Sequence, residues 1–198
     1  MQTTPGTPLS GDQPPAAAPP HRKAALIWAV AGTAVVLDQI SKIVIVATMP
    51  DRAPIELLGG LLTITYGRNS GAAFSLGEGL TLVFTLVAVG VVAVVARMSG
   101  RVRSTAWALA LGCLAGGALG NLVDRIFRAP GPGRGEVVDW IQLPNYPVFN
   151  LADSFVVCAA VAIVVLSWRG IPWDGALAAD ASDTANTANS TDPMPPTP

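Results

Sequence analysis

The sequence predicts an all-α membrane protein, a bundle of four transmembrane helices with a small β structure outside the membrane. Two observations support this fold class. Hydrophobic residues make up 51% of the 198 residues and charged residues only 13%, a composition too apolar for an ordinary soluble domain. The apolar residues also gather in four runs that, with their flanks, approach the length of a membrane-spanning helix.

Both ends of the chain are predicted to be disordered tails. Residues 1–23 begin with the proline-rich stretch MQTTPGTPLSGDQPPAAAPP, and residues 170–198 are rich in Ala, Asp, Thr, Asn and Pro. Segments of such low hydrophobicity cannot bury enough apolar surface to fold. One membrane domain is therefore expected over residues 24–169.

The first helix must continue beyond its apolar run. Ala24 to Leu37 covers only 14 residues, short of the roughly 20 that a bilayer requires, so the helix continues through DQISKIVIV. This extension carries Asp38 and Lys42, at i and i+4 on one helix face, to the outer border of the membrane. A simple ion pair and a functional pair both fit this spacing.

The segment from Met49 to Gly79 is predicted to form a β structure. It contains prolines, the Gly59-Gly60 pair and then LLTITY, whose branched and aromatic residues favour strands. It ends in RNSGAAFSLGEG, where Asn69 fits either a tight turn or a binding surface.

The second helix, Leu80 to Ala96, leads into a short basic loop with Arg97, Arg101 and Arg103. By the positive-inside rule this loop is cytoplasmic, and so are the basic start of the first helix and both chain ends.

The third helix starts near Thr105 and is predicted to be the central one. Gly112, Gly116 and Gly120 are spaced by four, which forms a groove where a neighbouring helix can pack closely. Its outer end reads GNLVDRI, and helical spacing places three polar side chains on one face: Asn121, Asp124 and Arg125. A structural polar network is the favoured interpretation of this trio, with Arg125 able to hold a carboxylate in a bidentate pair.

The fourth helix, Asn150 to Trp168, places Asp153 in its first turn. Asp139 precedes it in a short loop that carries Pro144 and Pro147. Two carboxylates brought together at a membrane border tend to share one proton and can act as acid and base. The alternatives are a helix cap for Asp153 and a solvated loop residue for Asp139.

All notable polar residues are expected at the outer end of the bundle, which indicates one shared site there rather than unrelated caps. Other classes of site lack support. A net charge of −1 argues against nucleic-acid binding, and Cys113 and Cys158 lie within apolar runs, where they pack as small hydrophobes. With one histidine, His21, we expect no metal, no cofactor and no Ser-His triad.

Five motifs resemble those of bacterial lipoprotein signal peptidase, signal peptidase II, in the same order along residues 24–169. They are DQISK (38–42), NSGAAFS (69–75), GNLVDR (120–125), VVDW (137–140) and FNLAD (149–153). The resemblance implies an aspartic endopeptidase of the inner membrane without a metal or cofactor. Its expected partners are membrane lipid and diacylglyceryl-modified prolipoproteins, whose signal peptide it removes just before the lipid-bearing cysteine.

The same resemblance assigns roles to single residues. It implies a catalytic dyad of Asp139, on a short periplasmic loop, and Asp153, near the outer leaflet. Residues 49–79 would form a β cradle beside the membrane. The residues that would support the dyad or hold the substrate are Asp38, Lys42, Asn69, Asn121, Asp124, Arg125 and Asn150.

Two other classes of protein remain as alternatives. A small proton-coupled transporter would use the intramembrane carboxylates as a relay, but the sequence shows neither acids spread through the membrane depth nor internal repeats. A serine peptidase would need a base for its nucleophile, and Ser41 points away from its neighbour Lys42 on a helix.

Overall fold

The computed structural model describes residues 21–70 and 79–174. Its helices are α1 (His21–Thr48), α2 (Gly79–Ser99), α3 (Thr105–Phe127) and α4 (Leu151–Trp168), and its strands are β1 (Ile55–Leu57), β2 (Leu62–Asn69) and β3 (Val137–Gln142), with the short 3-10 helix η1 (Leu58–Gly60) between β1 and β2. All four α-helices are long and apolar enough to cross a membrane. The predicted combination of four such helices and a small β structure is confirmed.

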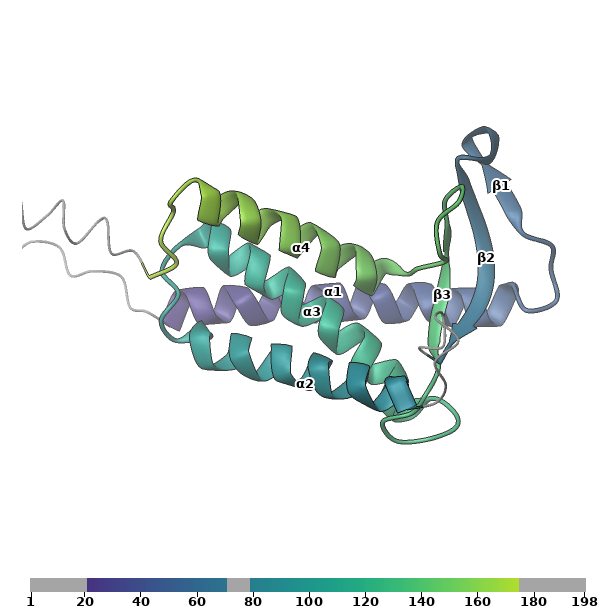
Figure 1. Cartoon of the computed structure of the whole chain (residues 1–198), viewed down its shortest axis with the longest axis horizontal. Coiled ribbons are helices and arrows are strands. Elements are labelled where there is room, and N and C mark those ends of the chain that lie inside the picture. The colour runs from purple at the N-terminus through teal and green to yellow at the C-terminus, as the bar shows by residue number, and fades with distance from the viewer. Residues whose placement is uncertain (1–20, 71–78, 175–198) are drawn as a thin grey trace, which may run out of the picture.

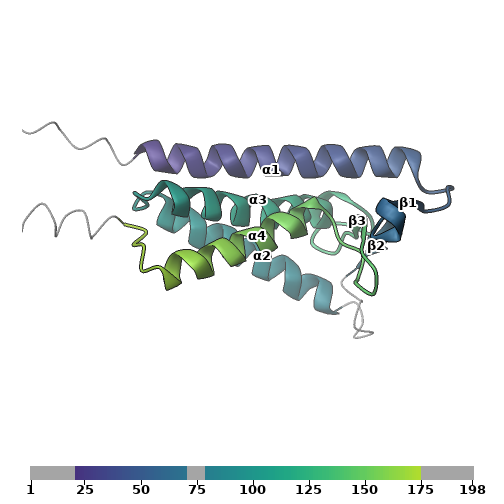
Figure 2. The ribbon, with the colours of Figure 1, turned by 90° about the horizontal axis from the view of Figure 1, so that it is seen from above.

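The four α-helices run side by side, and the sheet lies across one end of the bundle (Figure 1). We call this the sheet end, and the opposite end, where residues 100–104 connect α2 to α3, the loop end. The start of α1 and the end of α4 both lie at the loop end (Figure 1). In the view of Figure 2, α1 lies along one side of α3, with α2 and α4 on the other side.

Helix α3 is the centre of the bundle, as its glycines predict. A Cβ atom at Gly116 would lie 2.6 Å from the Cβ of Ala34 and 2.9 Å from the carbonyl oxygen of Ala31, both on α1. On another face of α3, a Cβ at Gly117 would lie 2.4 Å from the carbonyl oxygen of Ala152 on α4. These glycines let the backbones of α1 and α4 approach α3 closely.

The loop end is closed by residues that follow α4. Trp107 Nε1 donates a hydrogen bond of 2.7 Å to the carbonyl oxygen of Ile171, and the backbone N–H of Arg103 donates one of 2.9 Å to that of Trp173. Ile171 and Trp173 also pack against the apolar core at this end. These residues were predicted to belong to the tail, because their apolar side chains are few within a polar segment. Residues 21–23, also predicted to belong to a tail, are the first residues of α1, and residues 1–20 and 175–198 lie outside the described chain.

The sheet has the order β1-β2-β3, and both pairs are antiparallel. Strand β3 corrects the prediction that Asp139 lies on a loop. Gly67 and Asn69 of β2 are opposite Asp139 and Val137 of β3. The six residues VVDWIQ are too few to identify a strand by periodicity, and their pairing partner lies about seventy residues earlier in the chain.

After β3 the chain turns back and leads into α4. The backbone N–H of Ile141 donates to the carbonyl oxygen of Phe149 at 2.8 Å, and the N–H of Phe149 donates back at 2.9 Å. The intervening loop contains Pro144 and Pro147, as predicted. This return brings the start of α4 beside β3.

Candidate active site

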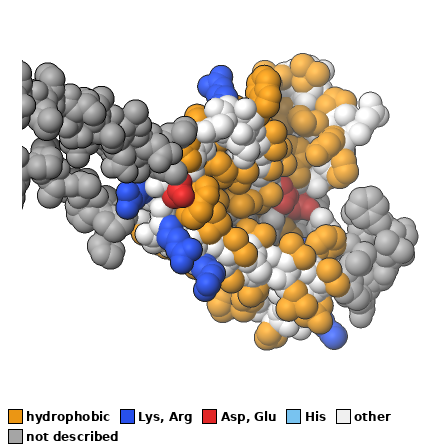
Figure 3. Space-filling view, turned by 60° about the vertical axis from the view of Figure 1, so that its left-hand side comes forward, with side chains coloured by type: hydrophobic (Ala, Val, Ile, Leu, Met, Phe, Trp, Pro, Cys, Tyr) orange, Lys and Arg blue, Asp and Glu red, His pale blue; other side chains and the backbone are white. Residues whose placement is uncertain are grey.

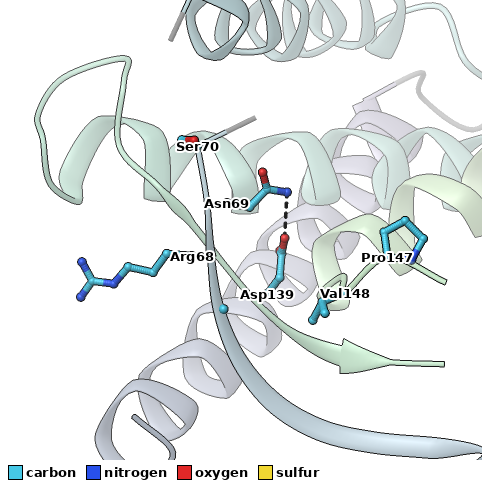
Figure 4. Close-up of a pocket in the computed structure, with 7 residues that line it drawn as sticks. Arg68, Asn69, Ser70, Asp139, Pro147 and Val148 are labelled. Atoms are coloured by element: carbon cyan, nitrogen blue, oxygen red, sulfur yellow. Dashed lines mark hydrogen bonds between the residues drawn. The ribbon is translucent and has the colours of Figure 1, made fainter. Parts of the chain in front are cut away.

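Asp139 is held by two asparagines on different elements. Its side chain is buried, with only 4% of the residue exposed. Oδ1 accepts a hydrogen bond of 2.6 Å from Asn150 Nδ2, and Oδ2 accepts one of 2.9 Å from Asn69 Nδ2. Figure 4 shows Asn69 and Asp139 pointing toward each other across the neighbouring strands β2 and β3. Both oxygens therefore have a fixed orientation.

Burial raises the pKa of Asp139 from 3.8 to about 6, because an ionised carboxylate loses hydration in this site. The hydrogen bonds from Asn69 and Asn150 act in the opposite direction, and the nearby charge of Asp153 adds to the increase in pKa. A carboxyl group with a pKa near 6 can exchange a proton close to neutral pH.

Asp153 lies in the first turn of α4, as predicted, and it is also part of a helix cap. Asn150 is the N-cap: its Oδ1 accepts from the backbone N–H of Asp153 at 3.0 Å, and its own N–H donates to Asp153 Oδ2 at 3.2 Å. Asp153 Oδ1 accepts a further bond of 2.8 Å from Asn121 Nδ2 on α3. The capping and candidate-site interpretations of Asp153 thus apply to the same side chain.

Asn150 joins the two carboxylates. It is fully buried, and it donates to Asp139 through Nδ2 and to Asp153 through its backbone N–H. The same Nδ2 donates to Asn121 Oδ1 at 3.2 Å. Both carboxylates are therefore hydrogen-bonded to the same asparagine, and the charge of Asp153 contributes to the raised pKa of Asp139.

Beside the two carboxylates, a buried lysine binds three partners. Lys42 Nζ lies 2.8 Å from Asp38 Oδ2, 2.9 Å from Asp124 Oδ2 and 3.1 Å from Asn121 Oδ1. The side chains of Lys42, Asp38 and Asp124 are fully buried. The predicted pair of Asp38 and Lys42 is confirmed, and the link to Asp124 on α3 is an addition to it.

The three polar residues predicted to share one face at the end of α3, Asn121, Asp124 and Arg125, do not all share the same partners. Asp124 pairs with Lys42 and, through Oδ1, with Arg128 Nε at 2.6 Å. Arg125 instead lies over the ring of Phe84 on α2, 5.7 Å from its centre, and its buried Nη1 has no hydrogen-bond partner among the described residues. Adjacent residues on a helix point in directions about 100° apart, which agrees with the different contacts of Asp124 and Arg125.

Each of the two carboxylates faces a different hollow. Asp139, Asn69, Pro147 and Val148 line a cavity of about 320 Å³ beside the sheet (Figure 4). Asp153 lies at the polar end of a groove of about 270 Å³ between α2, α3 and α4. The polar end also contains Asn121 and Arg125, and the rest of the groove is lined by Phe84, Val87, Ala88, Val91, Leu114, Ala118 and Val156.

The space-filling view agrees with this arrangement. Hydrophobic side chains cover most of the visible flank of the helices, and acidic side chains show at the bottom of a hollow (Figure 3). The visible face thus combines a broad apolar surface with a recessed acidic site.

Two residues of the site were missed by sequence reasoning. Gln39 Nε2 donates to Asp38 Oδ2 and to the carbonyl oxygen of Gly120, both at 3.0 Å. Arg128 pairs with Asp124 at the i, i+4 spacing, a signal that could have identified it, whereas no spacing rule points to Gln39. Of the motif NSGAAFS, only Asn69 and Ser70 lie within the described chain. Among all the residues that the structure describes, no group of three or more His, Cys, Asp or Glu side chains could hold a metal.

Comparison with solved structures gives the class of protein. The chain is similar to two structures described as bacterial membrane enzymes, determined by the in meso method at 1.9 and 2.3 Å resolution. They are 28% and 27% identical to it, with TM-scores of 0.63 and 0.64. The matches cover 71% and 73% of this chain and 91% and 88% of the two structures. The four apolar helices with a polar site at the sheet end thus have the fold of a bacterial membrane enzyme.

Comparison with known sequences gives the family. Residues 30–169 match the family described as signal peptidase (SPase) II. The lipoprotein signal peptidase of Streptomyces coelicolor is 49% identical over 159 residues, 80% of this chain and 78% of that protein. The one from Rhodococcus jostii is 46% identical over 168 residues, which cover 83% and 85% of the two chains. The chain belongs to the signal peptidase II family.

This membership makes the chain a multi-pass membrane peptidase of lipoprotein maturation and confirms the resemblance in the five motifs. It also decides against the transporter alternative.

Proposed function

We propose that this peptidase cuts diacylglyceryl-modified prolipoproteins just before the lipid-bearing cysteine, with Asp139 and Asp153 as its catalytic dyad. One observation carries the proposal: Asn150 holds both carboxylates, next to the polar end of an apolar groove. The groove and the dyad serve the two halves of the task, because the substrate is anchored in lipid while its peptide bond must meet water.

The two carboxyl groups divide the chemistry. One, ionised, accepts a proton from a water molecule that attacks the scissile carbonyl carbon. The other, protonated, donates a hydrogen bond to the carbonyl oxygen and later gives a proton to the leaving amine. The raised pKa of Asp139 supports this division, since it keeps a proton available near neutral pH. Asn69 and Asn150 fix the orientation of Asp139 while the proton moves.

The groove between α2, α3 and α4 receives the apolar part of the substrate from within the bilayer. Its walls suit the acyl chains and the helical signal segment, since burying each methylene contributes about 0.8 kcal/mol. Arg125 reaches its polar end with a buried Nη1 that lacks a partner in the described chain. This group would donate a hydrogen bond to a carbonyl oxygen of the substrate near the cleavage site.

The distribution of charge supports the proposed orientation in the inner membrane. Arg97, Arg101 and Arg103 lie at the loop end, so this end and both chain termini face the cytoplasm. The sheet and the dyad then lie near the outer leaflet, where secreted prolipoproteins arrive. The peptidase domain covers residues 24–169 with the packed residues up to Asp174, and cytoplasmic tails flank it.

The dyad is tested by Asp139→Asn and Asp153→Asn, which keep the side chain's shape and remove its proton exchange. We expect each variant to lose at least about 10² in the rate of cleavage of a lipidated precursor peptide, the lower range of general acid–base contributions. Melting temperature is measured alongside, and Asp51→Asn, at an exposed position in the turn after α1, is the matched control.

A variant Asp139→Asn that melts like the wild type and cuts at the wild-type rate would remove Asp139 from the dyad. The wild-type enzyme is also given the same precursor without its diacylglyceryl group. Equal cleavage of both peptides would contradict the proposed lipid requirement and leave the dyad untouched.

A further inference from the structure

Two buried carboxylates, those of Asp38 and Asp124, accept hydrogen bonds from the backbone next to Asp153 and Asp139. Asp38 Oδ1 accepts a hydrogen bond of 3.0 Å from the N–H of Ala152, the residue before Asp153. Asp124 Oδ2 accepts one of 3.2 Å from the N–H of Val138, the residue before Asp139. We call these two interactions the backbone clasps.

A single ammonium group connects the two clasps. Lys42 Nζ lies 2.8 Å from Asp38 Oδ2 and 2.9 Å from Asp124 Oδ2. Asp38 and Lys42 belong to α1 and Asp124 to α3, two helices that pack closely along the glycine groove. The clasps are therefore mounted on two closely packed helices.

We propose that Lys42 is a positioning residue that sets the relative placement of Asp139 and Asp153 through the two backbone clasps. This inference rests on the proposed function, in which these two residues form the dyad. Lys42 would not contact the substrate. It would hold α4 and β3 at the spacing in which the two carboxylates can act on one water molecule and one peptide bond.

The two N–H groups in the backbone clasps explain how Lys42 can affect Asp139 and Asp153 without touching their side chains. Ala152 is the second residue of α4, where an N–H has no partner within the helix, and Val138 lies on an edge strand of the sheet. Both residues are buried, at 0% and 1% exposure, so each N–H needs a partner inside the protein. Fixing the backbone one residue before each carboxylate limits where that carboxylate can lie.

A lysine fits the junction because its ammonium group has three donors and here has three acceptors, the third being Asn121 Oδ1. Asn121 in turn donates to Asp153. A Cβ at Gly120 would lie 2.7 Å from Asp38 Oδ2, so this glycine leaves the room that Asp38 occupies. The charges also balance, since Lys42 and Arg128 face Asp38 and Asp124.

The first test compares Lys42→Met with Lys23→Met in the full-length enzyme. These are the two lysines of the chain. Lys23 lies near the start of α1, where it hydrogen-bonds Thr105 of α3, far from Asp139 and Asp153. We expect Lys42→Met to lower kcat on a lipidated precursor on the order of 10²-fold, with KM within about twofold, because misplacement of reacting groups by about 1 Å costs that much. Lys23→Met should keep both constants.

A readout independent of activity is hydrogen–deuterium exchange at the backbone amides of Val138 and Ala152. Lys42→Met should speed exchange at both amides, and Lys23→Met at neither. This readout remains valid if the dyad assignment fails, which would show separately as full activity of Asp139→Asn.

The double variant Asp38→Asn/Lys42→Met distinguishes the loss of charge balance from the loss of positioning. It removes one charge of each sign, so the melting temperature should return toward that of the wild type, while kcat stays low because the two clasps are no longer joined. A double variant that folds and turns over at the wild-type rate would overturn the proposal, as would Lys42→Met with a raised KM and an unchanged kcat. If neither variant folds, hydrogen–deuterium exchange of the wild type is the test. The proposal is contradicted if the backbone amides of Val138 and Ala152 exchange as fast as the amide of Gln142 at the end of β3.

Discussion

At the scale of single residues, the site consists of carboxylates whose every oxygen is assigned a donor. Asp139 receives its two hydrogen bonds from asparagines, which are neutral, whereas Asp38 and Asp124 receive theirs from Lys42 and from backbone or other side chains. At Asp139 the effect of burial on the pKa outweighs the hydrogen bonds from Asn69 and Asn150 and the nearby positive charge of Lys42, which all act in the opposite direction. Its pKa is therefore raised to about 6.

This pKa predicts how stability depends on pH. Between pH of about 4 and about 6, the folded protein keeps a proton on Asp139 that the unfolded chain has released, so raising the pH through this range weakens the fold. The difference in unfolding free energy, wild type minus Asp139→Asn, should therefore fall as the pH rises. Unfolding in detergent micelles at several pH values measures it. A difference that is constant or grows with pH contradicts the raised pKa.

Sequence reasoning found most residues of the site but not all of their partners. The pairing of Asp38 with Lys42 follows from spacing within one helix, and the structure has it at 2.8 Å. The bond between Lys42 and Asp124 depends on how α1 faces α3, which no local pattern contains. Arg125 was grouped with Asn121 and Asp124 by helical spacing, whereas in the structure it lies over the ring of Phe84 on α2.

At the scale of elements, α3 determines how closely the other helices pack. The predicted glycine groove was recognisable because four-residue spacing repeats on one helix face. Strand β3 was not, because a strand exists only with its partner, and β2 lies far away in the sequence. Local helical patterns were thus easier to predict than pairing between distant segments.

The glycine groove predicts an asymmetric response to a single methyl group. Gly116→Ala should lower the free energy of unfolding by about 1–3 kcal/mol, because its Cβ would overlap Ala34 and the backbone of Ala31. Gly90→Ala on α2 is the matched control, since nothing lies within 4 Å of the added Cβ there. Unfolding of both variants in the same detergent gives the comparison. Equal stability of the two would mean that α1 can shift away from α3 without cost.

At the scale of the whole molecule, composition and four apolar runs were sufficient to predict the architecture. Each run is recognisable by itself, because a membrane-spanning helix satisfies its own backbone hydrogen bonds. The extent of the packed chain was less predictable. Ile171 and Trp173 contribute to the loop-end core although the segment around them is polar.

The proposed orientation in the membrane is tested by labelling single cysteines in intact cells. With Cys113 and Cys158 replaced by alanine, Gly100→Cys at the loop end should react with a membrane-impermeant maleimide only after permeabilisation. Ala53→Cys, between α1 and β1, should react from outside, because the basic loop keeps the opposite end in the cytoplasm. The reverse pattern would place the sheet and the dyad on the cytoplasmic side.

The two carboxylates lie on different elements, Asp139 on β3 and Asp153 on α4, yet Asp124 and Asp38 tie both elements to the helix pair α1 and α3. A loop that doubles back at Ile141 and Phe149 connects the two elements. Any tilt of the sheet away from α3 would have to break the hydrogen bond between the N–H of Val138 and Asp124. With the dyad as proposed, we expect a compound that displaces Val138 from Asp124 to inhibit the peptidase without touching Asp139 or Asp153.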